Sequence, residues 1–544
     1  MRAWSPAEPT PRALEQVVYG GAVLLLTLPW LWPFASGPSP QVEPWLASVA
    51  CGGLLLLLAV FARVPLLPAL TCAWMVAASA SCVIAMLQYF GLSKGLAPWI
   101  NVAPIGEAFA NLRQRNQFAT LTNIGLATLL LSDAAQRNFG IMRLPFSKPS
   151  SKGQPGWVVV GAAALMAAGN AASASRTGMV QLGLILILLA AWGYWRQAAT
   201  RRLAWLVVLA YGSAALLLPR LAGLDPSASG ILARLQDGGP ACASRWVLWG
   251  NVWQLVIDKP WWGWGWGWGE LDFAHFMHLY SGPRFCDILD NAHNLPLHLA
   301  VEMGLPAAVF ACGLGLWVVW RARPWREASP VRQMAWAVLA LILLHSMLEY
   351  PLWYGPFQIA ALVCIWLLLT TRGGASVSET GVVSPPDLAQ SKVCGVVTGK
   401  TIGALALLVL CLVAYAAWDY QRVSQIYLAP ERRMSGYKDN TLKKIRDSRL
   451  FGNQVRFAEL STVELSPANA AYVNSLAKDL LHFSPETRVV EKVIESALLL
   501  GRDSEAREYL DRYRAAFPTD FARWASLHGI EPRLSPAPRA HGPP

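Results

Sequence analysis

Charged residues are scarce in this chain of 544 residues. It holds 45 lysines and arginines and 33 aspartates and glutamates, together 14% of the total. Soluble globular proteins carry about 25%. Hydrophobic residues make up 54%, and the mean hydropathy is +0.36. This composition excludes an ordinary soluble protein and indicates one that is embedded in a membrane.

Metal-binding patterns are also missing from the sequence, which has no His-Glu-x-x-His, Cys-x-x-Cys or Asp-x-Asp. We therefore expect neither a metal nor a cofactor. Most of the nine cysteines lie in or beside apolar stretches, where cysteine packs as a small apolar residue. Cys242 and Cys286 lie in a long polar loop instead. A disulfide between them needs an oxidising compartment and a close approach, which the sequence leaves open.

The sequence contains many long apolar windows. A stretch of about 20 apolar residues can cross a bilayer as a helix. We count eleven, within a range of ten to thirteen because two are long enough to tilt or break. The predicted fold class is an all-α polytopic membrane protein, whose first window lacks a small-residue cleavage site and should be retained. The windows are 17–34, 44–62, 66–90, 117–134, 157–173, 178–195, 203–219, 294–320, 333–350, 356–371 and 401–418.

The orientation follows from the basic residues, because short cytoplasmic loops are enriched in lysine and arginine. These loops explain most of the net charge of +12 when the N-terminus is placed in the cytoplasm. No basic patch interleaved with aromatic residues points to nucleic acid. Eleven spans then put the long loop 220–292 and the C-terminal segment outside, whereas an even number would move that segment to the other side.

Composition divides the chain into a membrane body at 1–418, a helical domain at 419–530 and a disordered tail at 531–544. In the helical domain, 485–500 and 503–517 carry apolar residues at helical spacing and are separated by Gly501. The stretch 506–518 resembles the second helix of a tetratricopeptide hairpin. No clean repeat of 34 residues is present, so the prediction is a helical-hairpin domain.

A histidine stands where the long loop meets the window at 294–320, in Asn291-Ala-His-Asn294. An imidazole at a boundary between water and lipid suits chemistry on a lipid-linked substrate, and His293 is the candidate. The alternative is an interfacial histidine that caps a helix. The loop before it contains Trp264, Trp266 and Trp268, separated by glycines. Tryptophan prefers the bilayer interface, but its face also stacks on sugar rings.

Four arginines, Arg113, Arg115, Arg176 and Arg245, are predicted to face outward against the inward bias of basic residues. Any one could be an interfacial arginine that reaches for water. Together they suggest a shared anion, and a diphosphate suits the planar guanidinium fork. His345 and Glu349 lie one helical turn apart near a span end, which favours either a cavity lining or a structural pair.

The order of these motifs resembles that of the Wzy/WaaL/PglL superfamily of bacterial membrane glycan ligases and polymerases. The resemblance covers roughly 100–370. The helical extension, with Glu349-Tyr-Pro-Leu-Trp353, is most similar to PglL-type protein O-oligosaccharyltransferases. The motifs that carry the resemblance are Arg113-Gln-Arg-Asn-Gln117, Ser175-Arg-Thr-Gly178, Arg245-Trp, the Gly/Trp loop and Asn291-Ala-His-Asn294.

The resemblance implies transfer of a glycan from an undecaprenyl-diphosphate donor to Ser or Thr of an exported protein such as a pilin. The reaction would be inverting and metal-independent, on the periplasmic side of a bacterial inner membrane. His293 would be the general base, and Arg176 and Arg245, with Arg113 and Arg115, would bind the diphosphate. Supporting roles fall to Asn116, Gln117, Asn294, His345, Glu349 and Tyr350.

Other acceptors remain open: the lipid A core, as in an O-antigen ligase, or a second glycan, as in a polymerase. A non-enzymatic alternative is a transporter that binds the same lipid diphosphate with the same arginines. A C-terminal domain that docks protein favours a protein acceptor. We expect this domain to select or position the acceptor and not to carry the chemistry.

Overall fold

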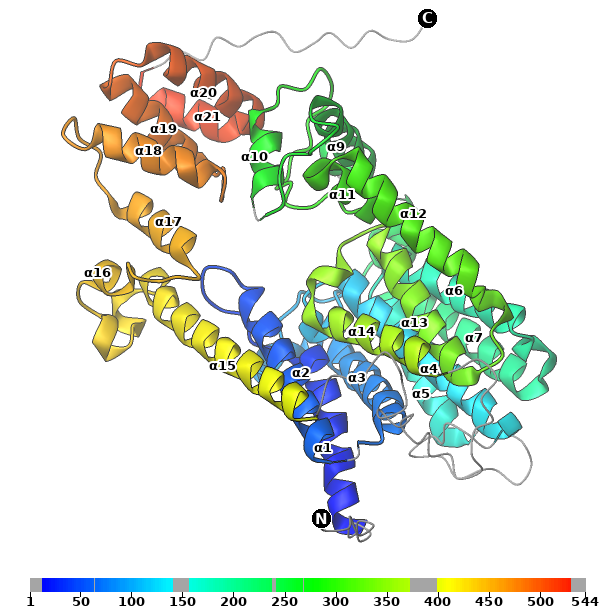
Figure 1. Ribbon diagram of the computed structural model, residues 1–544. Helices are drawn as coiled ribbons and strands as arrows, with labels where there is room; N and C mark the ends of the chain where they lie inside the picture. The colour runs from blue at the N-terminus through cyan, green and yellow to red at the C-terminus, as the bar shows by residue number, and fades with distance from the viewer. Residues whose placement is uncertain are drawn as a thin grey trace, which may run out of the picture. The chain divides into compact units, whose positions relative to one another are not determined.

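The computed structural model describes residues 12–62, 64–139, 156–236, 241–267, 269–371 and 399–529, and the regular secondary structure of these residues is helical (Figure 1). This confirms the predicted fold class. The chain forms two compact units. We call Met1–Gly238 with Leu314–Ser424 the transmembrane unit, and Gly239–Gly313 with Gln425–Pro544 the loop–C-terminal unit.

The transmembrane unit contains most of the predicted windows as separate helices. These are α1 (Arg12–Leu31), α2 (Val42–Phe61), α3 (Leu66–Tyr89), α4 (Arg115–Phe139), α5 (Trp157–Ala172), α6 (Arg176–Ala191), α7 (Ala198–Leu221), α13 (Pro330–Ser346), α14 (Gly355–Thr370) and α15 (Gly399–Ser424). The unit also contains the short helix α8 (Gly230–Gln236), which lies in the predicted loop 220–292.

Ten of the eleven predicted windows each coincide with a single helix, and the window at 294–320 does not. In the described part of the chain, seven helices are long and apolar enough to cross a membrane: α1, α2, α3, α4, α7, α12 (Leu305–Ala322) and α15. The boundary between the two units lies within α12. The other four, α5, α6, α13 and α14, are also apolar but have only 16 or 17 residues. A helix of that length is about 24–26 Å long, short of the roughly 30 Å hydrocarbon core.

The predicted single span at 294–320 is wrong, because the chain breaks there into α11 (Leu295–Met303) and α12. The break is at Gly304, whose φ of +87° favours glycine. A Cβ at this position would lie 2.2 Å from the carbonyl oxygen of Trp261. The close approach of another backbone segment, which hydropathy does not report, therefore ends the helix.

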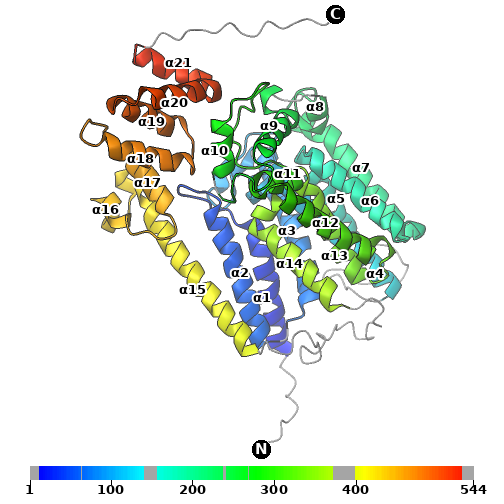
Figure 2. The ribbon, with the colours of Figure 1, turned by 45° about the horizontal axis from the view of Figure 1, so that its top comes forward.

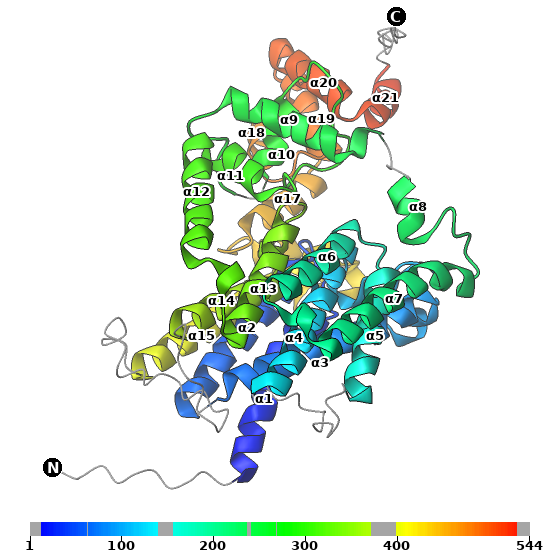
Figure 3. The same ribbon diagram turned by 90° about the vertical axis from the view of Figure 1, so that its right-hand side faces the viewer.

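Helix α4 lies at the centre of the transmembrane unit, with its membrane window wholly buried, and α3, α5, α6 and α13 pack around it (Figure 3). Small residues permit this close packing. A Cβ on Gly125 would meet Ala78, and one on Gly169 would meet the sulfur of Cys82. At the edge of the unit, α15 runs beside α2 (Figures 1 and 2).

The loop–C-terminal unit has two apolar cores. The loop core, which includes Leu248, Leu289 and Val301, lies among α9 (Arg245–Asp258), α10 (Glu270–Met277) and α11. The C-terminal core lies among the hairpin-like helices that follow α16 (Thr441–Ile445). These are α17 (Gly452–Thr462), α18 (Ala470–Leu481), α19 (Thr487–Leu499), α20 (Asp503–Ala516) and α21 (Pro518–Leu527).

Helices α19 and α20 agree closely with the two helices predicted at 485–500 and 503–517. Composition divided the chain once, at residue 418. The two structural units are divided differently, because the loop residues Gly239–Gly313 group with the C-terminal helices. The last span, α15, continues to Ser424, and its final turns bury an ion pair of 2.8 Å between Asp419 and Arg422. The predicted tail at 531–544 lies outside the described residues.

Candidate functional site

Arg176 and Arg245 occupy the same local position, the first residue of a helix that a serine caps. At α6 the Ser175 hydroxyl accepts a hydrogen bond of 3.0 Å from the backbone N–H of Gly178. At α9 the Ser244 hydroxyl accepts one of 3.3 Å from Val247. The positive end of a helix favours anions, and here each one also carries a guanidinium. Each helix start therefore combines a helix N-terminus with a guanidinium, and both features attract anions.

His293 stands at a third helix start, just before α11. It has a φ of +49°, and its backbone N–H donates to the Asn291 side chain at 2.7 Å. The cap of α11 is Asn294, whose side-chain oxygen accepts from Leu297 at 3.1 Å. The alternative reading of His293 as a helix cap is therefore wrong, because Asn294 fills that role. The predicted supporting residue Asn294 acts by starting the helix next to His293.

Helix α9 connects Arg245 to the segment of His293 within the loop–C-terminal unit. Trp249, one turn after Arg245, donates from its indole N–H to the carbonyl of Ala292 at 3.1 Å. Ala292 is fully buried in the loop core. The side chain of His293 is only half buried. The fold thus fixes the backbone beside His293 while leaving its imidazole partly accessible.

His298 and Glu302 lie one turn apart on α11, with 3.4 Å between Nε2 and Oε2. Burial and the nearby charge of His293 lower the pKa of His298 to about 4. Burial raises the pKa of Glu302 to about 7. Between these values both groups are neutral, so the contact is a polar one between uncharged side chains.

A disulfide joins Cys242 to Cys286 across the loop, with 5.5 Å between their Cα atoms. The sequence alone did not show whether these two cysteines are bonded, and the structure shows that they are. Nearby, the Asn251 side chain donates to Pro283 and accepts from Phe285, at 2.9 Å and 2.7 Å. These contacts tie α9 to the chain that leads to His293.

Replacement of Cys242 and Cys286 by Ser should destabilise this loop. The bond spans 44 residues, and closing a loop of that length contributes about 4 kcal/mol in the chain-entropy model. Thermal unfolding of the purified protein measures the loss, with Cys312→Ser on α12 as the control. Rapid labelling of both thiols in the native wild-type protein would contradict the disulfide.

The transmembrane unit gathers a second group of charges around Arg176. Arg115 pairs with Glu107 at 3.3 Å, and Arg234 of α8 donates to the Ala174 carbonyl at 3.3 Å. Burial, together with the charges of Arg115 and Arg176, lowers the pKa of Arg234. The Glu107 carboxylate offsets part of this positive charge. Arg234 was not identified from the sequence, because its place depends on how α8 packs against α5 and α6.

Asn116 and Glu349 support the start of α6. Asn116 donates to Glu349 at 3.1 Å and accepts from the Ser175 hydroxyl at 2.6 Å. Ser175 in turn caps the helix that presents Arg176. The buried carboxylate of Glu349 therefore acts on the Arg176 position through two hydrogen bonds.

His345 belongs to the same buried polar network. Its Nδ1 lies 2.9 Å from the Thr120 hydroxyl, which also contacts Gln181 at 3.1 Å. Gln117 is buried on α4, and its side-chain oxygen has no hydrogen-bond partner among the described residues. Gln181 was missed from the sequence, since a lone glutamine in an apolar helix carries no pattern.

Gly178→Ala should displace the start of α6. A Cβ on Gly178 would lie 2.4 Å from the Asn170 side-chain oxygen and 2.6 Å from the Ala119 Cβ. Overpacking of this kind costs about 1–3 kcal/mol, and Arg176 should move with the helix. Thermal stability and donor binding report the two effects. Gly183→Ala on the same helix is the matched control, because nothing lies within 4 Å of the added atom. Equal behaviour of the two variants would contradict the steric argument.

Two further predicted residues, Arg113 and Tyr350, contact neighbouring groups of the protein. Arg113 donates to the Pro33 carbonyl, and burial lowers its pKa. Tyr350 packs between the rings of Trp353 and Tyr354, with centroid distances of 6.0 and 5.9 Å.

Of the three tryptophans predicted to stack on sugars, Trp264 binds its own loop. Its indole N–H donates to Leu255 at 2.8 Å, and Lys259 Nζ lies 3.9 Å from the ring centroid. Trp266 is 77% exposed. Trp268 lies outside the described residues.

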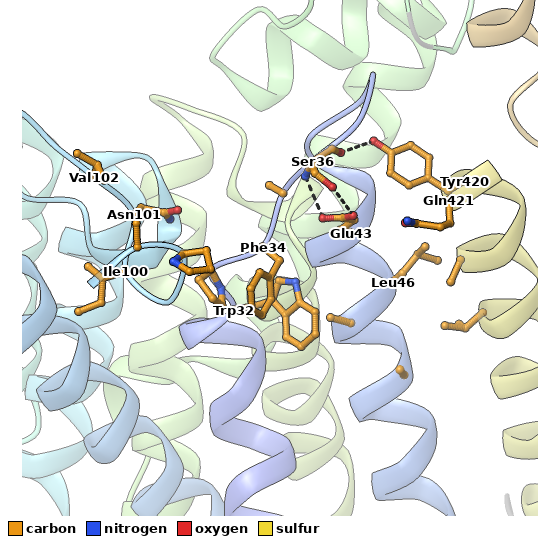
Figure 4. A pocket seen from close by; sticks show the side chains of 18 residues that line it. Trp32, Phe34, Ser36, Glu43, Leu46, Ile100, Asn101, Val102, Tyr420 and Gln421 are labelled. Atoms are coloured by element: carbon orange, nitrogen blue, oxygen red, sulfur yellow. Dashed lines mark hydrogen bonds between the residues drawn. The ribbon is translucent and has the colours of Figure 1, made fainter. Parts of the chain in front are cut away.

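A cavity of about 810 Å³ opens among the α1–α2 link, α2, the chain near Asn101 and α15 (Figure 4). Trp32 and Phe34 contribute apolar surface, and Glu43 accepts two hydrogen bonds from Ser36. None of the predicted site residues lines this cavity. We therefore do not assign it to the candidate site.

Three family models match the chain. Residues 108–131, with the α4 motif, match the model described as protein glycosylation ligase. Residues 161–312, with Arg176, Arg245 and His293, match O-antigen ligase. Residues 333–529, from α13 to the end of the C-terminal helices, match the C-terminal part of virulence factor membrane-bound polymerase. No curated protein matches the sequence. The three matches follow one another along the chain and confirm its resemblance to the superfamily of O-antigen ligases and protein glycosylation ligases.

Proposed function

We propose that this protein transfers a glycan from an undecaprenyl-diphosphate-linked donor to Ser or Thr of an exported protein such as a pilin. The reaction takes place on the periplasmic side of a bacterial inner membrane. The loop disulfide between Cys242 and Cys286 supports an oxidising compartment for this loop. The C-terminal helices group with the loop and lie on the same side in this proposal.

In the proposed reaction the acceptor hydroxyl oxygen attacks the anomeric carbon of the first sugar. His293 takes the hydroxyl proton, as suits a side chain that exchanges protons near neutral pH. The bond between the anomeric carbon and the phosphate oxygen breaks, and its electron pair leaves with the undecaprenyl diphosphate. A single displacement inverts the anomeric centre.

Arg176 and Arg245 hold the diphosphate and stabilise the charge that grows on it as it leaves. Arg115 and Arg234 add positive charge next to Arg176. The observation that carries the proposal is the repeated helix start: two serine-capped helices present an arginine, and a third, capped by Asn294, follows His293 directly. The two arginine positions favour an anion, and His293 supplies a proton acceptor; these are the two needs of this transfer.

A second candidate keeps the chemistry and changes the acceptor to the lipid A core or to another glycan. The matches to O-antigen ligase and to a membrane-bound polymerase favour it. Mass spectrometry of secreted proteins and of lipopolysaccharide, from cells with and without the gene, separates the candidates. Glycopeptides that disappear with the gene support protein transfer. A change confined to lipopolysaccharide would replace it with the second candidate, and no change in either would contradict both.

Transfer should continue in the presence of EDTA, because arginines neutralise the departing diphosphate. Among the described residues no three or more His, Cys, Asp or Glu side chains gather closely enough to hold a metal ion. The measurement is the initial rate in purified membranes before and after chelation. Loss of activity that one divalent ion restores would show that carboxylate ligands take part.

A further inference from the structure

Helix α10 (labelled in Figure 1) contributes buried residues to both cores of the loop–C-terminal unit. Leu271 and Ala274 pack into the loop core, with Leu289 and Ala292. Phe276 is 1% exposed and belongs to the C-terminal core. Because α10 packs tightly into both cores, a movement of one core is transmitted through this helix to the other.

Polar contacts hold the same helix to the C-terminal domain. Glu270 pairs with His482 at 3.1 Å, and the His482 ring stacks on Phe273 with 3.8 Å between centroids. Arg512 of α20 donates to the Met277 carbonyl at 3.0 Å. Both ends of α10 are therefore fastened to the C-terminal helices.

Just before α10, Gly269 has a φ of +90°, and a Cβ there would lie 2.3 Å from the His482 carbonyl oxygen. The backbone of the Gly/Trp loop thus lies directly against α18 and the turn after it. This contact explains a glycine at the end of that loop without reference to a sugar.

On its other side α10 reaches the segment that carries His293. The Asp272 carboxylate accepts a hydrogen bond of 3.0 Å from the backbone N–H of Leu289, four residues before His293. Leu289 is fully buried, and Ala292 packs in the same core. A displacement of α10 would therefore shift the backbone at Leu289 and, through it, the position of His293.

We propose that the C-terminal helical domain holds the His293 loop in position. Helix α10 connects the two, and Phe276 is its main positioning residue. This role goes beyond acceptor recognition, because the domain is then needed for the proton-transfer step itself. The inference rests on the proposed function of His293.

The test uses the full-length protein with Phe276→Ala. We expect hydrogen exchange of the amides at 285–295 to rise and kcat to fall by about tenfold or more, since small misplacements of a catalytic group are costly. The KM for the undecaprenyl-diphosphate-linked donor should change little. Leu279→Ala is the matched control, because it removes an exposed apolar side chain just after α10.

Arg512→Gln provides a second variant in case Phe276→Ala fails to fold. This substitution on α20 removes the hydrogen bond to the Met277 carbonyl. Hydrogen exchange at 285–295 should rise and kcat should fall, each by a smaller factor than in Phe276→Ala. Arg507→Gln, exposed on the same helix, is its control. Unchanged exchange at 285–295 in the Arg512 variant and in any folded Phe276 variant would overturn the inference. So would a fall in kcat without a rise in exchange.

The outcome is separate from that of the proposed function. If both variants loosen 285–295 while His293→Ala keeps full activity, the positioning of the loop by α10 is supported. The proposed role of His293, and with it the need for the domain in proton transfer, then fails. If His293→Ala is inactive while the Phe276 and Arg512 variants behave like wild type, the role of His293 stands. The proposal that the C-terminal domain positions the His293 loop is then overturned.

Discussion

His293→Ala should abolish most glycan transfer, with kcat lowered by about 100-fold to 10,000-fold, the range for loss of a general base. The variant should fold normally, because the imidazole is only half buried and the cap of α11 is Asn294. The measurement is single-turnover transfer from a lipid-linked donor to an acceptor peptide, at equal membrane levels of each variant.

His278→Ala is the matched control for His293, since it removes an imidazole from the same loop that already pairs with Asp258 at 2.8 Å. His345→Ala makes a second contrast. Its imidazole is buried beside Thr120, so thermal stability should fall in that variant. Wild-type transfer by the His293 variant would remove the proposed mechanism.

Arg176→Lys and Arg245→Lys should each lower transfer by about tenfold to a hundredfold, the scale for a lost charge-stabilising group. Lysine keeps the positive charge but loses the planar fork that binds two phosphate oxygens together. Because both arginines are first residues of capped helices, the helices should survive the change. Steady-state kinetics with the lipid-linked donor should show the loss mainly in kcat/KM.

Arg220→Lys is the matched control for the two arginine variants. Arg220 is exposed near the end of α7 and donates to the Leu216 carbonyl within its own helix. Its replacement should leave transfer unchanged. Unaltered donor affinity and rate in both Arg176→Lys and Arg245→Lys would make these arginines ordinary interfacial residues.

Local patterns predicted much of the candidate site. Asn291-Ala-His-Asn294 pointed to His293, and its neighbour Asn294 is the cap of α11. The Ser-Arg pairs at Arg176 and Arg245 are both helix starts. Such features are visible in a sequence because a cap and the helix it starts lie within four residues of each other.

Contacts between distant residues could not be predicted in this way. Arg234 acts on Arg176 because α8 folds back, and Glu349 reaches Ser175 only through Asn116. Each of these contacts joins residues more than 50 positions apart, and their spacing along the chain contains no signal.

By itself the sequence determined the all-α membrane fold, ten of the eleven predicted apolar helices and the α19–α20 hairpin, because hydrophobic length and helical periodicity are properties of single segments. Only the tertiary structure decided the break at Gly304, the disulfide between Cys242 and Cys286, and the union of the loop with the C-terminal helices through α10. Each of those depends on which surfaces meet, and packing decides that among segments far apart in the chain.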